Sequence, residues 1–338
     1  MPTEPTVKTS DSTRRTNGVN ATKWATRRVA DVMLDNIVWL LLVGFSIVAG
    51  LSSPFFLTTA NLQNILVQAT VLSMIALAVG VTLLIAQIDL SVIGNLVFSG
   101  LIGVLLVRAG VPGVIAILAT VATGTAVGLV NGVFVAKLKM NSLIETLAMG
   151  LVLTGAVLAI TEGKTLTVAA SSYTYLGNAR VGGWPLMPLM FIVTYVIAGI
   201  VSTRTAWGRR LYAVGGNPRA ATAAGIRIDA VRVQAFIVAG AIAGVAGFLQ
   251  TSYLSGVNTT VASDLLLYAV AAPVIGGVSL FGGYGRVIGL LGGALLITVT
   301  QVALQIVNVS AYYVQIVGGG MILLAVFVDA IRIRRRGL

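Results

Sequence analysis

The sequence contains neither cysteine nor histidine. Disulfide bonds, haem ligation through histidine, the usual zinc sites and nucleophiles activated by histidine are therefore excluded. Charged residues are also scarce, at 9% of the chain, whereas ordinary soluble domains contain about 25%. We expect no catalytic residues, no metal site and no cofactor.

Hydrophobic residues, in contrast, make up 57% of the 338 positions. A chain this apolar would aggregate in water, so its surroundings must be largely lipid. We predict an all-α polytopic membrane protein with about ten transmembrane helices, because one span needs roughly 20 apolar residues. The predicted spans lie near residues 34–52, 62–86, 90–107, 113–136, 142–161, 186–203, 233–255, 264–281, 287–307 and 312–331.

The basic residues indicate the orientation of these spans. With both termini in the cytoplasm, all but three of the 22 Lys and Arg residues lie inside. This asymmetry agrees with the positive-inside rule, so the net charge of +12 indicates topology and not a nucleic-acid partner. We expect a flexible cytoplasmic N-terminal tail at 1–33, a transmembrane domain at 34–331 with a cytoplasmic loop at 204–232, and a basic cytoplasmic C-terminal tail at 332–338.

The longest cytoplasmic loop contains the signals of a short helix. Asn217 is a favourable N-cap, Pro218 suits the first helical position, and Gly225 suits the stop after the last turn. Gly215 and Gly216 are predicted to form a turn before it. A helix of about two turns is not stable alone in water, so it needs a surface to rest on. That surface is either its own membrane domain or a separate protein into which it docks as a coupling element.

The glycine-rich stretch 276–285, GGVSLFGGYG, raises the question of a phosphate site. No Lys-Ser or Lys-Thr pair follows Gly282, and the spacing of a dinucleotide fingerprint is absent, so this interpretation fails. The stretch is interpreted as a tight turn with close helix packing. The chain then has no nucleotide site of its own, and uphill transport would need an ion gradient or a partner ATPase.

The few carboxylates at membrane depth lie near span ends, where they cost little. Asp89 follows the second span, where Gln87-Ile88-Asp89 allows a break. Glu145 is expected to pair with a nearby Lys or Arg at the cytoplasmic edge. An ion-driven carrier usually has a mid-span carboxylate relay, and the lack of one in this sequence favours the partner ATPase.

Glycines at four-residue spacing indicate candidate tight helix crossings, because small residues let backbones approach in a membrane. Their simplest role is packing. These sets are Gly124/Gly128/Gly132, Gly240/Gly244 and Gly285/Gly289/Gly293.

Four stretches together resemble one family. They are LYAVGGNPRAATAAGI, VIGGVSLFGGYGRVIGLLGGALL, IDLSV and ILLAVFVDAIRIRRR. They resemble the membrane permease of bacterial ABC importers for ribose, xylose, galactose and related sugars, including autoinducer-2, from about residue 35 to the C-terminus. The resemblance implies a non-enzymatic, multi-pass subunit of the bacterial cytoplasmic (inner) membrane. It also implies a second permease copy in a homodimer or pair, a cytoplasmic ABC ATPase and an extracytoplasmic sugar-binding protein.

The resemblance further implies that the segment 212–226 couples to the ATPase. Some other positions depart from the family, for example Ala86-Gln87 where it usually has two glycines before IDLS, and these departures leave the sugar open. The candidate coupling residues are Tyr212, Gly215, Gly216, Asn217, Pro218, Arg219, Ala220, Ala221 and Gly225.

Polar residues inside otherwise apolar spans are candidates to line a translocation path: Gln68, Asn95, Asn131 and Tyr268. Each could instead make a hydrogen bond between helices. The longest outer loop, 161–184, carries Tyr173, Tyr175, Asn178 and Arg180, and it is either a docking surface for a binding protein or a plain linker. Two alternatives to the importer are a secondary transporter or channel acting alone and a membrane scaffold without transport.

Overall fold

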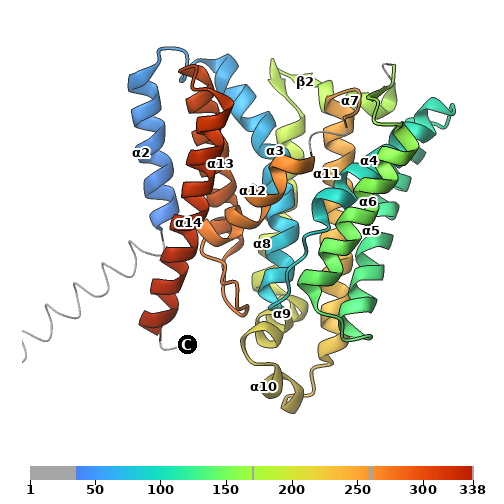
Figure 1. Cartoon of the computed structure of the whole chain (residues 1–338), viewed down its shortest axis with the longest axis vertical. Coiled ribbons are helices and arrows are strands. Elements are labelled where there is room, and N and C mark those ends of the chain that lie inside the picture. The colour runs from blue at the N-terminus through green and yellow to red at the C-terminus, as the bar shows by residue number, and fades with distance from the viewer. Residues whose placement is uncertain (1–35, 170, 259–261, 337–338) are drawn as a thin grey trace, which may run out of the picture.

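The computed structural model describes residues 36–169, 171–258 and 262–336, which form a bundle of long helices (Figure 1). The predicted N-terminal tail at 1–33 lies outside the described residues. The helices of the bundle are α2 (Ile37–Ser52), α3 (Thr59–Leu84), α4 (Val92–Arg108), α5 (Gly113–Ala136), α6 (Ser142–Thr161), α8 (Met187–Arg204), α11 (Ile228–Tyr253), α12 (Ala262–Ile275), α13 (Val287–Ile306) and α14 (Ala311–Arg336).

The lengths of these helices agree with the predicted spans. Each predicted span overlaps one bundle helix, and the spans at 113–136 and 142–161 coincide with α5 and α6. By length and composition α3, α5, α6, α8, α11 and α13 can cross a membrane, whereas α2, α4 and the apolar part of α12 are shorter. The mostly helical architecture is confirmed, and the number of ten crossings stays a prediction.

The largest differences concern helix ends. Helix α11 begins at Ile228, five residues before the predicted apolar span. The prediction missed this start because the first turn of the helix contains charged residues and lies outside the apolar run. Helix α12 ends at Ile275, where Gly276 and Gly277 follow and Gly277 has a φ of +85°. Helix α14 continues to Arg336, so the predicted tail at 332–338 is helical up to that residue; arginine is a good helix former and favours a helix C-terminus.

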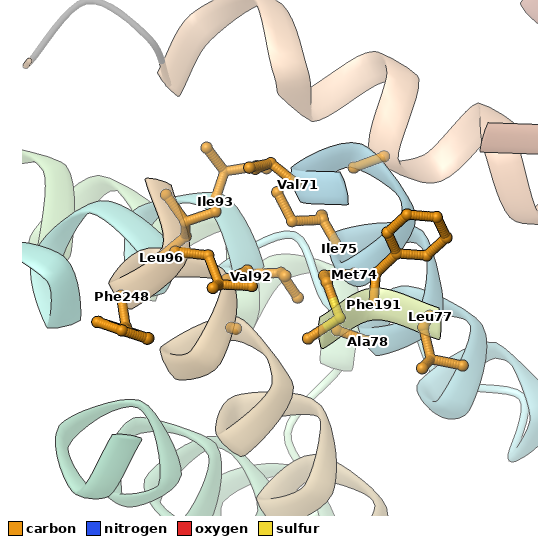
Figure 2. Packing of buried hydrophobic residues seen from close by; sticks show 14 of the residues in the cluster. Val71, Met74, Ile75, Leu77, Ala78, Val92, Ile93, Leu96, Phe191 and Phe248 are labelled. Atoms are coloured by element: carbon orange, nitrogen blue, oxygen red, sulfur yellow. The ribbon is translucent and has the colours of Figure 1, made fainter. Parts of the chain in front are cut away.

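Helix α3 lies at the centre of the bundle. Every residue from Ala69 to Leu84 is buried, on all sides of the helix, because α4, α8, α11, α12 and α13 pack around it. Figure 2 shows Val71, Met74 and Ile75 of α3 among Val92 of α4 and other apolar side chains. A movement of α3 would therefore displace side chains on the five helices that pack around it.

Two of the predicted glycine sets meet each other in one tight crossing. A Cβ atom on Gly124 of α5 would lie 2.6 Å from the carbonyl oxygen of Gly240 and 2.7 Å from the Cα of Gly244, both in α11. In the third set, Gly293 of α13 touches the backbone of Ala272 in α12, Gly289 touches the backbone of Gly276 directly after α12, and Gly285 precedes α13. The predicted close packing is therefore confirmed for α5 with α11 and for α12 with α13.

The short elements gather at the two ends of the bundle. At one end lie α7 (Ser172–Asn178), the antiparallel pair β1 (Leu166–Thr167) with β4 (Gly256–Val257), and the hairpin β2 (Arg180–Val181) with β3 (Trp184–Pro185). At the other end lie α9 (Ala206–Gly216), α10 (Pro218–Ala223) and the C-terminal part of α14 (Figure 1). The predicted outer loop and the predicted cytoplasmic loop are thus at opposite ends.

Candidate coupling site and translocation path

The short helix predicted after Asn217 is present as α10. The Asn217 side chain accepts a hydrogen bond from the Ala220 N–H at 3.0 Å, and Pro218 occupies the first helical position. Beyond the last turn Gly225 has a φ of +77°, a conformation that favours glycine. The local signals in the sequence therefore act as predicted.

The predicted turn at Gly215-Gly216 is wrong. Both glycines belong to the last turn of α9, which runs to Gly216 and is joined to α10 through Asn217 alone. Two adjacent glycines usually favour a turn, but here the helical backbone at Gly215 lies against the backbones of Leu84 and Gly283 with no room for a side chain. The segment 204–232 accordingly contains α9 in addition to the predicted short helix, and its last residues begin α11.

Helix α10 touches its own domain by one narrow face. Ala221 is buried and packs into a cluster that includes Leu211 and Val214 of α9 and Val231 of α11. The other residues of α10, together with Ala224 and Gly225, are exposed. One alanine thus anchors a helix whose remaining surface is free to meet another molecule.

The surface around α10 is basic and hollowed. A groove of about 580 Å³ runs between α10 and the ends of α5 and α11, lined by Lys137, Thr222, Gly225, Ile226, Arg227, Ile228, Asp229 and Ala230. Lys139 forms an exposed ion pair with Asp229 at 2.6 Å across the rim. In the part of the chain that the structure describes, no group of three acidic side chains could hold a metal ion.

Tyr212 fastens α9 to the glycine-rich stretch. Its Oη donates a hydrogen bond to the carbonyl oxygen of Gly285 at 3.0 Å. Burial raises the pKa of the Tyr212 phenol above its ordinary value, and an interaction with Ser202 offsets only part of this effect. The phenol therefore keeps its proton at neutral pH and remains a donor.

The four path candidates are in different surroundings. Asn95 is buried and donates to the carbonyl oxygen of Gly124 at 3.0 Å, and buried Asn131 donates to Ser91 Oγ at 2.7 Å, so both link α4 or the segment before it to α5. Gln68 is exposed and bonds to Asn64 within α3. Tyr268 is partly buried on α12, and its ring lies against α14. The hydrogen-bonding alternative thus describes the two asparagines.

The expected pairing of Glu145 with a Lys or Arg is wrong. Glu145 is 4% exposed, and neither of its carboxylate oxygens has a hydrogen-bond partner. It is near enough to Asp89 for the two charges to interact, and Asp89 lies in the non-helical segment between α3 and α4 and accepts hydrogen bonds from the N–H and Oγ–H of Ser91. The break expected near Asp89 exists: α3 ends at Leu84, and Ala86 has a φ of 56°.

The outer loop is structured and not a plain linker, because it contains α7 and short paired strands; its role as a docking surface stays a prediction. Tyr173 is fully buried with its hydroxyl 2.7 Å from Thr251 Oγ1, and Asn178 donates to the carbonyl oxygen of Ser252. Tyr175 is 66% exposed, and exposed Arg180 holds the β2–β3 hairpin to Gln63 of α3. Of the four residues, Tyr173 alone is buried, and the other three are exposed, although Asn178 and Arg180 also hold the loop to its neighbours.

Comparisons with known proteins agree with these features. A family model described as a branched-chain amino acid transport system / permease component matches residues 61–326. The L-arabinose ABC transporter permease protein of Azospirillum brasilense is 35% identical over 302 residues, which cover 89% of each chain. The ribose import permease protein of Escherichia coli K12 is 36% identical over 293 residues, covering 86% of this chain and 91% of the relative. The D-allose transport system permease protein of the same strain is 33% identical over 292 residues, covering 86% and 90%.

No solved structure matches the chain. The family match covers most of the residues, and the relatives are aligned over nearly their whole length. The chain therefore belongs to the family of permease components of bacterial ABC importers, and it is a multi-pass transport subunit of the cytoplasmic membrane rather than an enzyme.

Proposed function

We propose that this permease subunit forms the translocation path for a sugar and receives the work of ATP hydrolysis through α10. Three relatives that cover most of the chain are named for the transport of L-arabinose, ribose and D-allose, which supports a monosaccharide as the solute. The solute would be delivered from outside by a sugar-binding protein, and a separate cytoplasmic ATPase would grip α10.

The observation that carries this proposal is the surface of α10. Only Ala221 is buried, while Pro218, Arg219 and Ala220 are exposed on a helix too short to be stable by itself. A protruding helix with so few contacts of its own would gain from a partner that encloses it. Its basic surroundings would suit acidic groups on that partner.

The topology we propose has ten spans and both termini in the cytoplasm. The bundle helices α2, α4 and α12 would then cross the bilayer in spite of their short length, in contact with the longer helices around them. The basic residues near α10 and the C-terminal arginines of α14 lie at the same end of the bundle, which supports a cytoplasmic assignment for that end. The end with α7 and the β2–β3 hairpin would then face outward.

We further propose that two copies of the chain form the path between them, as a homodimer. Gln68 of α3 and Tyr268 of α12 are better path candidates than Asn95 and Asn131. Among the described residues, neither Gln68 nor Tyr268 uses its polar group in a hydrogen bond between helices. The exposed Tyr175, Val181 and Trp184 at the outer end supply an apolar surface on which a sugar-binding protein would dock.

The test is an assembly and uptake experiment with the purified ATPase and binding protein in lipid vesicles. Ala220→Trp adds a bulky group to the exposed face of α10 and should abolish association with the ATPase. Ala206→Trp, equally exposed at the start of α9, is the matched control and should retain it. Full association of the Ala220→Trp protein would refute the proposal.

The same vesicles separate the importer from a transporter or channel acting alone. Uptake should require the ATPase and ATP, and it should be independent of proton and sodium gradients. Uptake that follows either gradient without the ATPase would establish the alternative. Screening monosaccharides against the binding protein would identify the solute.

A further inference from the structure

We propose that Gly215 of α9, Gly283 of the glycine-rich stretch and Leu84 at the end of α3 form a backbone joint that carries movement of α10 into α3 and α13. We call these three residues, with their neighbours Gly216 and Gly282, the glycine joint. The inference rests on the proposed coupling role of α10. It gives a role in transmitting movement to the glycine-rich stretch, which the sequence alone explains as a tight turn with close helix packing.

The three backbones in the joint touch without any side chain between them. The Gly283 N–H donates to the Leu84 carbonyl oxygen at 3.0 Å. A Cβ atom on Gly215 would overlap that same oxygen and would lie 2.5 Å from the Gly283 nitrogen. A Cβ atom on Gly283 would overlap the Cα of Gly216. Only glycine can occupy these positions at the present spacing.

The joint forms at the carbonyl group of Leu84, which has no hydrogen-bond partner within α3. The last carbonyl groups of a helix have no partner within the helix, and α3 ends at Leu84. The glycine-rich stretch supplies the missing donor from Gly283, which has a φ of +71°. Gly282 has a φ of +83° and lies close to Ala86. A Cβ atom added to Gly282 would be 2.6 Å from the backbone nitrogen of Ala86. The stretch thus caps α3 and also rests on α9.

Tyr212 is a second attachment one helical turn before the joint. It lies three and four residues before Gly215 and Gly216, so the three residues share one face of α9. Its hydrogen bond to the Gly285 carbonyl oxygen holds the far part of the same stretch. Helix α9 is therefore fixed to the stretch at two points, and the stretch leads directly into α13 at Val287.

Contact between backbones transmits displacement better than contact between flexible side chains. A side chain can change its rotamer and absorb a small shift, whereas a close-packed backbone contact must move or break. Only Asn217 separates α10 from α9, so a pull on α10 reaches Gly215 with little slack. The motion then passes to Leu84, and through it to the buried central helix. We infer that this route links ATP-driven movement of α10 to reorganisation of the bundle.

The test compares alanine substitutions at glycines in helices, using the complete transporter in vesicles. The Cβ atom of Gly215→Ala must push both Leu84 and Gly283 away from α9. The Cβ atom of Gly199→Ala in α8 has no atom within 4 Å. The measured quantity is solute imported per ATP hydrolysed. We expect Gly215→Ala to lower this ratio at least five-fold while ATPase association persists, and Gly199→Ala to leave it unchanged. An unchanged ratio in the Gly215→Ala transporter would overturn the proposal.

Two further variants complete the test: Tyr212→Phe keeps it decisive if Gly215→Ala fails to assemble, and Gly216→Ala is a second control if Gly215→Ala does assemble. Tyr212→Phe keeps the ring and removes the hydroxyl, with its bond to Gly285 and its interaction with Ser202. It should lower the ratio about two-fold or more with normal assembly; an unchanged ratio would overturn the proposal. A Cβ on Gly216 would meet only ordinary contact, 3.7 Å from the Cα of Gly283, so Gly216→Ala should cost clearly less coupling than Gly215→Ala. Equal losses would indicate contact with the ATPase and refute the joint.

Failure of the joint and failure of the proposed function give different results. If Ala220→Trp abolishes ATPase association but the variants at Gly215 and Tyr212 import normally, only the joint is refuted. If Ala220→Trp binds the ATPase normally, the coupling role of α10 itself is refuted.

Discussion

Replacing Asn217 tests how α10 is kept folded. Its side chain accepts the Ala220 N–H at 3.0 Å, and its backbone carbonyl accepts the Ala221 N–H at 2.9 Å. Asn217→Ala removes the first of these bonds and keeps the second. Asn217→Asp and Asn217→Ser keep a side-chain acceptor and serve as matched controls.

The expected magnitude follows from the few contacts of α10. Loss of an N-cap costs about 1 kcal/mol. The only buried side chain of this helix is the methyl group of Ala221, whose burial contributes no more than about 0.8 kcal/mol. The cap is therefore a large part of the local stability. A loss of about 1 kcal/mol should increase the unfolded population of α10 about five-fold.

Amide hydrogen exchange measures this change directly. The amides of Ala221 and Ala224, which bond to Asn217 and Ala220, should exchange about five-fold faster in Asn217→Ala, and the Asp and Ser variants should resemble the original protein. Solute-stimulated ATP hydrolysis should likewise fall in Asn217→Ala and remain close to the original level in the Asp and Ser variants. Normal exchange in Asn217→Ala, or equal impairment of all three variants, would refute the capping argument.

Three further predictions concern the bundle and are measured as thermal unfolding of the purified protein at pH 7. Gly124→Ala should destabilise by about 1–3 kcal/mol because its Cβ would lie 2.6 Å from a carbonyl oxygen of α11, whereas Gly155→Ala, with nothing within 4 Å, should not; equal effects would contradict the crossing. Glu145→Gln should stabilise by about 1–3 kcal/mol because it removes a buried carboxylate without a hydrogen-bond partner, and destabilisation would show that this carboxylate has a partner. Lys139→Ala should cost less than about 1 kcal/mol because its ion pair is exposed, and a larger loss would mean that the pair is part of a stronger network.

Much of the fold could be predicted because the bilayer fixes the length of an apolar run. The bounds of α5 and α6 follow directly from hydropathy. The start of α11 could not be found in this way, because Asp229 and Arg232 belong to a helical extension outside the apolar run. Hydropathy indicates whether a residue is surrounded by lipid or by water. It contains no information on whether a polar residue next to a span is helical.

The site shows the same division between local and tertiary information. Helix α10 could be predicted because Asn217, Pro218 and Gly225 act on their own neighbours. The burial of Glu145 could not be predicted, because its position near a span end does not tell which side of α6 it is on, and the structure buries its carboxylate without a hydrogen-bond partner. Sequence rules of short range therefore succeed at caps and fail wherever a partner comes from another helix.

The glycines of the joint make this limit concrete. Gly215 and Gly216 on one side and Gly282 and Gly283 on the other are separated by more than 60 residues in the chain, and each pair alone has the composition of a turn. Their shared property is the space they leave for each other and for the end of α3. A glycine needed for close approach cannot be told from a glycine needed for a turn until its neighbour is known. The two motifs that identify this family by resemblance are therefore in contact, and a substitution in one is best interpreted together with the other.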